Sequence, residues 1–162
     1  MNLTGKKGIA YILKIILMII FVICILSMII TPMFLEKGMI KNEKLGLTVV
    51  LIYISSVPAL IMLYQFIKIF EQLENENIFT KIIERRFLKS SICSIIIGII
   101  YIMNILIIPS KIASFERTSI IVYVFFSAIT AVIFLMFGIG LIILREIYKT
   151  AIQNKEENDL TI

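Results

Sequence analysis

Few residues of this chain have side chains that carry out chemistry. The chain contains no histidine, and its only aspartate is Asp159, close to the C-terminus. Zinc hydrolases, His-based triads and intramembrane metalloproteases need an imidazole as a metal ligand or general base, so these classes are excluded. We therefore expect a protein that is not an enzyme, with no catalytic residue, no metal site and no cofactor.

Two polar side chains fall inside apolar runs. Lys14 lies near the start of the first run, and Asn104 lies deep in the third. An ionisable residue within a membrane is a functional-site candidate, but a lysine so near the end of a span can extend its stem to the interface. We expect Asn104 to hydrogen-bond across a helix interface, facing the bundle with Tyr101, or alternatively to contact a ligand. Lys14 and Asn104 are thus the candidate intramembrane polar residues.

The two cysteines, Cys24 and Cys93, are not expected to form a disulfide. Cys24 lies about 15 residues into the first run and Cys93 about 3 into the third, which at 1.5 Å per residue separates them in depth by well over about 10 Å. A disulfide needs Cα atoms within about 7 Å of each other. Both cysteines are interpreted as small hydrophobic residues.

The composition indicates that the chain lies in a lipid bilayer. Hydrophobic residues make up 60% of the chain, and its mean hydropathy is +1.04. Soluble domains contain about 45–50% apolar residues, so lipid must be the solvent for most of this surface. The net charge of +5 comes from basic residues at the edges of the apolar runs. That arrangement suits anionic lipid headgroups and does not favour direct binding of nucleic acid.

Four long apolar runs predict an all-α fold, an integral membrane bundle of four transmembrane helices in a single domain, 1–162. The expected spans are about residues 9–30, 45–67, 90–110 and 118–144. The first run exceeds the roughly 7–15 residues of a secretory signal core and no small-x-small cleavage site follows it, so it is expected to stay as a span.

Prolines and small residues suggest how the spans are shaped. Pro32 is expected to end the first span, and Pro58 is expected to bend the second, with the hydroxyls of Ser55 and Ser56 near the freed carbonyls. The small residues expected to let helices approach closely are Ser94, Gly98, Gly138 and Gly140.

A polar elbow, residues 68–89, separates the second and third spans. Apolar residues recur within it at helical spacing, opposite Lys81, Glu84 and Arg85, which predicts a short amphipathic helix. This helix either lies at the membrane interface, or its apolar face binds a partner. The candidate partner-binding residues of the elbow are Phe79, Thr80, Ile83 and Phe87.

The polar tail, residues 145–162, ends on apolar side chains. Its last residues are candidates for partner binding through a backbone nest, through strand addition, or by folding back on the elbow's Phe79–Phe87 face. These candidates are Asp159, Leu160, Thr161 and Ile162. A solvated terminus is the alternative interpretation.

The distribution of basic residues predicts the orientation. Eleven of the 16 Lys and Arg residues lie in the N-terminus, the first helix near its start, the elbow and the tail, and five lie in the two other loops. The positive-inside rule therefore predicts a multi-pass protein of the bacterial cell membrane with both termini cytoplasmic.

The ending KEENDLTI, together with four spans and an elbow that reads LENENIFTKIIERRF, resembles the bacterial domain-of-unknown-function family DUF2975. The resemblance extends over nearly the whole chain. It implies a small integral membrane protein, often encoded beside a small Cro-like helix-turn-helix regulator.

Two functions from different classes are expected on this basis. The first is a regulatory or anchoring protein whose elbow and tail bind a cytoplasmic partner, such as that DNA-binding regulator. The alternative is a bacteriocin self-immunity or membrane-stress protein, or a small transporter subunit, acting within the bilayer. Self-association into a homo-oligomer is left open.

Overall fold

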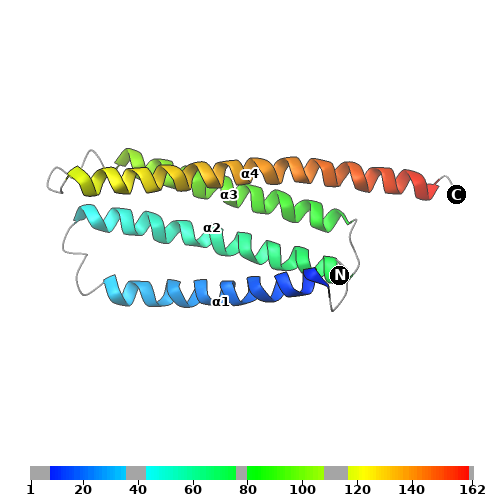
Figure 1. The fold of residues 1–162 in the computed structure, drawn as a ribbon, viewed down its shortest axis with the longest axis horizontal. Coiled ribbons are helices and arrows are strands. Elements are labelled where there is room, and N and C mark those ends of the chain that lie inside the picture. The colour runs from blue at the N-terminus through cyan, green and yellow to red at the C-terminus, as the bar shows by residue number, and fades with distance from the viewer. Residues whose placement is uncertain (1–7, 36–42, 76–79, 108–116, 161–162) are drawn as a thin grey trace.

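The computed structural model describes residues 8–35, 43–75, 80–107 and 117–160. They form four α-helices: α1 (Ile9–Leu35), α2 (Glu43–Glu74), α3 (Lys81–Ile107) and α4 (Arg117–Leu160) (Figure 1). Each helix contains a segment long and apolar enough to cross a membrane, and the described residues include no strand. The predicted all-α fold with four membrane helices is therefore confirmed.

The helices pack in chain order, α1 on α2, α2 on α3 and α3 on α4 (Figure 1). Side chains of α2 also reach α4, since the rings of Phe66 and Phe137 are 6.0 Å apart. Most large apolar side chains of α1 are exposed, for example Ile19 and Ile29. In a bilayer such surfaces face lipid tails, so α1 is the helix least enclosed by protein.

One end of the bundle, called here the elbow end, holds the start of α1, the end of α2, the start of α3 and the later part of α4 (Figure 1). Ion pairs join these segments, between Lys14 and Glu74 and between Lys81 and Glu156. The start of α1 and the end of α4 thus lie at the same end of the bundle, as an even number of spans requires.

Small residues bring α3 close to α4. Ser94 Oγ donates a hydrogen bond of 2.6 Å to the carbonyl oxygen of Phe134. A Cβ added at Gly98 would lie 2.7 Å from Leu135 Cγ, and one added at Gly138 would lie 2.8 Å from Ile95 Cγ1 and 3.2 Å from the Ser91 carbonyl oxygen. Ser94, Gly98 and Gly138 therefore act as predicted, because bulkier side chains would separate the two helices.

Gly140 does not take part in this contact. A Cβ added there would have no described atom within 4 Å, because the residue lies on an exposed face of α4. The expectation that Gly140 allows close packing is therefore wrong.

The helices run beyond the apolar runs that predicted them. Most of the elbow belongs to α2 and α3, and the tail continues α4 to Leu160. Lys, Arg, Glu and Gln are good helix formers, so a charge marks the membrane boundary without ending the helix. The amphipathic segment predicted in the elbow is helical, but it is not a separate short helix, because its described residues form the first turns of α3.

The prolines also behave differently from the prediction. Pro32 lies inside α1, which continues to Leu35, because a proline removes one backbone donor and the helix can resume after it. Ser55 and Ser56 donate to the carbonyls of Ile52 and Tyr53. Neither hydroxyl bonds the carbonyl of Ile54, which is the one that Pro58 leaves without its helical donor.

The contact between α3 and α4 can be tested with a matched pair of glycine substitutions. Gly138→Leu should lower the free energy of unfolding by about 1–3 kcal/mol, because the new side chain must displace Ile95 or the Ser91 backbone. Gly140→Leu adds the same atoms on an open face and should not lower it. Thermal unfolding in detergent micelles measures both, and equal losses for the two variants would contradict the described packing.

Candidate functional site

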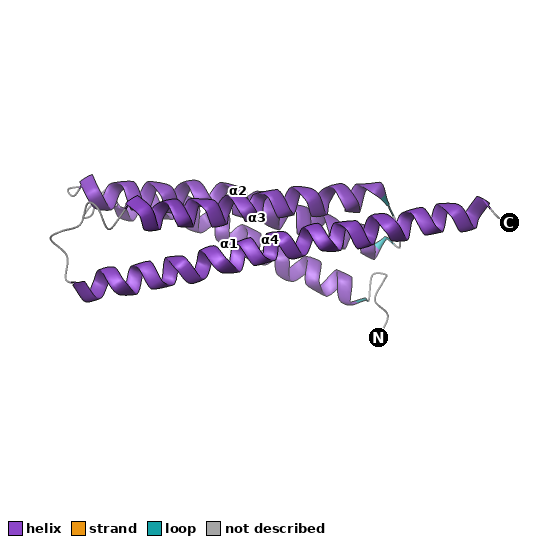
Figure 2. Ribbon diagram, turned by 90° about the horizontal axis from the view of Figure 1, so that it is seen from above, coloured by secondary structure: helices purple, strands orange, loops and turns teal. Residues whose placement is uncertain are grey.

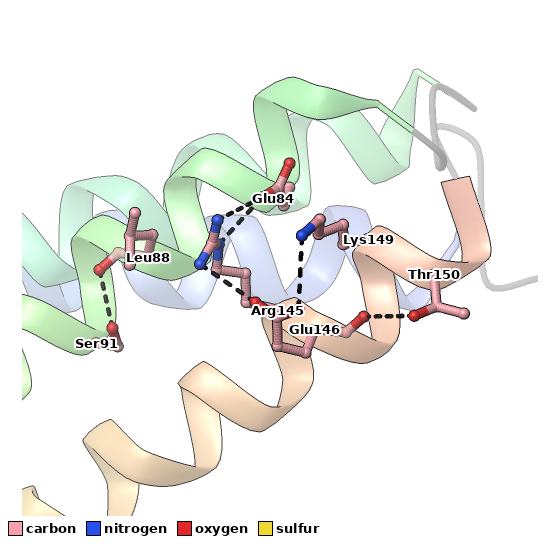
Figure 3. Close-up of polar contacts among 7 residues, drawn as sticks. All are labelled: Glu84, Leu88, Ser91, Arg145, Glu146, Lys149 and Thr150. Atoms are coloured by element: carbon pink, nitrogen blue, oxygen red, sulfur yellow. Dashed lines mark hydrogen bonds and ion pairs between the residues drawn. The ribbon is translucent and has the colours of Figure 1, made fainter. Parts of the chain in front are cut away.

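Arg145 and Glu84 form the central ion pair of the elbow end (Figure 3). Arg145 Nε and Nη2 donate to Glu84 Oε1 at 3.0 and 2.8 Å. The side chains are only 25% and 16% exposed, so water screens the pair weakly. The pair joins the start of α3 to α4 where α4 leaves the predicted membrane span.

Further contacts on α4 surround this pair (Figure 3). Glu146 Oε1 lies 3.4 Å from Arg145 Nη1, and its other carboxylate oxygen lies 3.9 Å from Lys149 Nζ. Thr150 Oγ1 donates to the Glu146 carbonyl oxygen. These contacts are local to α4, so the Glu84 pair is the one among them that crosses between helices.

An apolar cluster lies beside the ion pair. Its buried members are Ile69, Ile83, Phe87 and Leu141. The ring of Phe87 meets the ring of Tyr148 edge to face, with centroids 5.6 Å apart and an interplanar angle of 64°. Edge-to-face packing of this kind adds about 0.5–1.5 kcal/mol beyond the buried area.

The candidate elbow residues are therefore used within the chain. Ile83 is 0% exposed and Phe87 is 8% exposed, both covered by α2 and α4. The side chains of Ile83 and Phe87 are thus covered by the chain itself and are not exposed to lipid or to a partner in this structure. The carbonyl of Thr80 accepts from the backbone N–H groups of Ile83 and Glu84 and so begins α3. Phe79 lies outside the described residues.

Part of the tail lies on the elbow, but this part does not include the last residues, for which the sequence suggested such a contact. The contact comes from the middle of the tail, since Tyr148 packs on Phe87 and Ile152 is buried. Lys81 Nζ pairs with Glu156 Oε1 at 3.0 Å. The side chains of Asp159 and Leu160, and all of Thr161 and Ile162, lie outside the described part of the chain.

Lys14 lies at the elbow end, where its ammonium pairs with the carboxylate of Glu74. The two side chains are 17% and 10% exposed. Lys14 Nζ also lies 5.4 Å from the centroid of the Tyr11 ring. The pair fixes α1 to the end of α2. Nothing local in the sequence indicates Glu74 as the partner, because the two residues are 60 positions apart.

Asn104 is buried in α3 at 1% exposure. Neither its Oδ1 nor its Nδ2 has a hydrogen-bond partner among the described residues. The predicted hydrogen bond across a helix interface is thus not found there. An unpaired buried amide costs about 1–3 kcal/mol.

The described residues contain no group of three or more His, Cys, Asp or Glu side chains that could hold a metal ion. Cys24 and Cys93 are both free. Among the described polar contacts at the elbow end, three ion pairs join two helices: Lys14–Glu74, Lys81–Glu156 and Glu84–Arg145.

The fold and these contacts define a multi-pass membrane protein with four apolar helices and an ion-paired polar end. Residues 6–162 match the model of the family described as "Protein of unknown function (DUF2975)". The chain belongs to this family, as its elbow and C-terminal residues predicted. No curated protein and no solved structure gives a significant match.

A charge swap tests the central ion pair. Glu84→Arg and Arg145→Glu should each lower the free energy of unfolding, because like charges then meet in a partly buried site. Combining the two reverses the pair and should recover about 1–2 kcal/mol relative to the sum of the single losses. Thermal unfolding of the four proteins in micelles gives this coupling, and purely additive losses would show that the residues do not interact.

A substitution at Asn104 tests its buried amide. Asn104→Leu should raise the free energy of unfolding by about 1 kcal/mol, because it removes two polar atoms without partners. Asn104→Asp, which keeps a polar group of similar size, serves as the control and should lower it. A loss of stability in the leucine variant would show that the amide is bonded in the folded membrane protein.

Proposed function

We propose that this protein is a regulatory or anchoring protein of the bacterial cell membrane, whose elbow end holds a soluble cytoplasmic partner. The observation that carries the proposal is the length of α4, which at 1.5 Å per residue is about 66 Å against a hydrocarbon core of about 30 Å. Seen from two directions, α4 projects beyond the other helices at the elbow end (Figures 1 and 2). A helix needed only to span the bilayer would not extend so far.

The projecting part of α4 suits a docking surface because its base is held in place. Arg145 and Tyr148 fix it to α3 and Ile152 is buried, while residues 153–158 are exposed. A surface whose position is already set loses less conformational entropy when a partner binds. The partner we propose is the small helix-turn-helix regulator that the family resemblance implies. The regulator would contact DNA, and this chain would not.

The elbow end is proposed to face the cytoplasm. Support comes from the sequence distribution of the basic residues, since eleven of the 16 belong to the N-terminus, the start of the first span, the elbow and the tail. A cytoplasmic elbow end places the projecting helix where a DNA-binding regulator is found.

The alternative function, self-immunity, membrane-stress protection or small-molecule transport, acts within the bilayer. The buried amide of Asn104 is the observation that favours it, because polar groups at membrane depth often line functional paths. Under this alternative, Asn104→Leu abolishes function at normal abundance. Under the anchoring function, the same variant still binds its partner.

Cysteine labelling tests the orientation. In a cysteine-free background, Lys41→Cys and Lys111→Cys should react with a membrane-impermeant maleimide added to whole cells. Asn154→Cys should react only after the cells are permeabilised. Labelling of Asn154→Cys in intact cells would place the elbow end outside and contradict the orientation.

Truncation tests partner binding. Deleting residues 159–162, or all of 153–162, should leave the melting temperature in nanodiscs unchanged, because Arg145, Tyr148 and Ile152 remain. Either deletion should weaken binding of the purified helix-turn-helix regulator by at least about tenfold, because a few residues carry most of the binding energy of an interface. Lys81→Gln removes the ion pair with Glu156 without shortening the helix, and should bind as the full chain does. Unchanged affinity in both truncated proteins would refute the docking surface.

A further inference from the structure

A groove of about 270 Å³ lies between α2 and α3 at the elbow end. It is lined by Tyr64, Gln65, Ile82, Arg85, Arg86 and Lys89. Three of these six side chains are cationic, and none is acidic. The groove is separate from the Arg145–Glu84 contact, which joins α3 to α4.

The cations of the groove have no carboxylate partner among the described residues. Three acids of the elbow end form ion pairs with other cations: Glu71 with Lys68 at 2.6 Å, Glu74 with Lys14, and Glu84 with Arg145. Glu71 also attracts Arg86, but at a longer range than an ion pair. Because those charges cancel in pairs, Arg85, Arg86 and Lys89 leave the groove with net positive charge. Such a groove attracts anions.

Arg86 is held in position within the groove. Its Nη1 donates to Gln65 Oε1 at 3.0 Å, and Gln65 is itself 7% exposed. The Nε–H of Arg86 is buried and has no hydrogen-bond partner among the described residues. The guanidinium is therefore fixed by a neutral group that does not cancel its positive charge, which favours an oxygen-rich anion in the groove. The buried Nε–H is covered by the chain and is not the donor that such an anion would meet.

The surroundings of the groove match a lipid headgroup. Arg85 and Lys89 are exposed, while Ile82 is 50% and Tyr64 45% exposed. The groove lies where the sequences of α2 and α3 change from apolar to polar. Apolar surface and cationic side chains therefore lie side by side at the same height along the bundle. A phospholipid offers the same two features, a phosphate beside acyl chains, and basic pockets between membrane helices bind such headgroups.

We propose that this groove binds the phosphate of an anionic phospholipid headgroup, with Arg86 as the fixed contact and Arg85 and Lys89 as flexible ones. The site is independent of partner binding by α4. With a lipid bound there, the contact between the start of α3 and the end of α2 would depend on the lipid composition of the membrane.

Native mass spectrometry of the delipidated full chain, titrated with phosphatidylglycerol, tests the proposal. The variant Arg85→Gln/Lys89→Gln removes two exposed cations and keeps the Arg86–Gln65 hydrogen bond, so its fold should be intact. The matched control Lys81→Gln/Lys149→Gln removes two exposed charges at the same end but outside the groove. Circular dichroism and size-exclusion chromatography verify that both are folded.

The groove variant should bind phosphatidylglycerol at least about tenfold more weakly than the wild type, while the control changes little. Arg86→Gln should weaken binding in the same direction. Equal binding by the groove variant, or an equal loss in the control, overturns the site. Inorganic phosphate should not displace the lipid at comparable concentration; if it does, the groove is a site for soluble phosphate and the lipid proposal fails.

Discussion

The close approach of α3 and α4 is the contact on which the rest of the elbow end depends. Lipid gives two apolar helices little reason to associate, so membrane helices rely on small residues that let them pack closely. Here Ser94, Gly98 and Gly138 perform that role. The antiparallel register that places Ser94 against Phe134 also places Glu84 against Arg145 and Phe87 against Tyr148. A shift in that register would break both contacts together.

The charges of the elbow end divide into two kinds. Lys14 with Glu74, and Arg145 with Glu84, are partly buried pairs that each join two helices. Removing one partner of such a pair lowers the free energy of unfolding by more than the intact pair contributes to it. The reason is that the other charge is then left buried without a partner. Arg85, Arg86 and Lys89 have no such partner among the described residues. The paired charges hold helices together, whereas these three cations form the site proposed to bind an anion.

Hydrophobic patterning predicts the number and order of the membrane helices well, because an uncharged run of about 20 apolar residues is typical of a membrane-spanning helix and of few other structures. The ends of the helices were predicted less well. Charged residues such as Lys89 and Arg145 marked where a span leaves lipid, but the helix continues through them. The apolar face at Ile83 and Phe87 was recognised, yet its partner was not, because amphipathic spacing does not say what covers the face.

The site contacts were beyond prediction for a related reason. Glu84 and Arg145 are 61 positions apart and meet only through the α3–α4 register. The Ser91 carbonyl oxygen likewise lies opposite Gly138, 3.2 Å from where a Cβ at that glycine would be. Local patterns carry no information on either pairing. The sequence pattern did identify Asn104 as buried within the membrane helices. It did not show that Asn104 lacks a hydrogen-bond partner among the described residues.

The central claim is that α4 continues past the membrane as one helix held against the start of α3. The most direct measurement is cross-linking in native membranes with a short bismaleimide, in a chain lacking Cys24 and Cys93. Lys81→Cys/Glu156→Cys joins two positions whose side chains form an ion pair, whereas Lys81→Cys/Asn154→Cys places the second thiol on another face of α4. The account predicts rapid cross-linking of the first pair and slow cross-linking of the second. Equal rates for both would show that this part of α4 is not docked on α3, and would contradict the account.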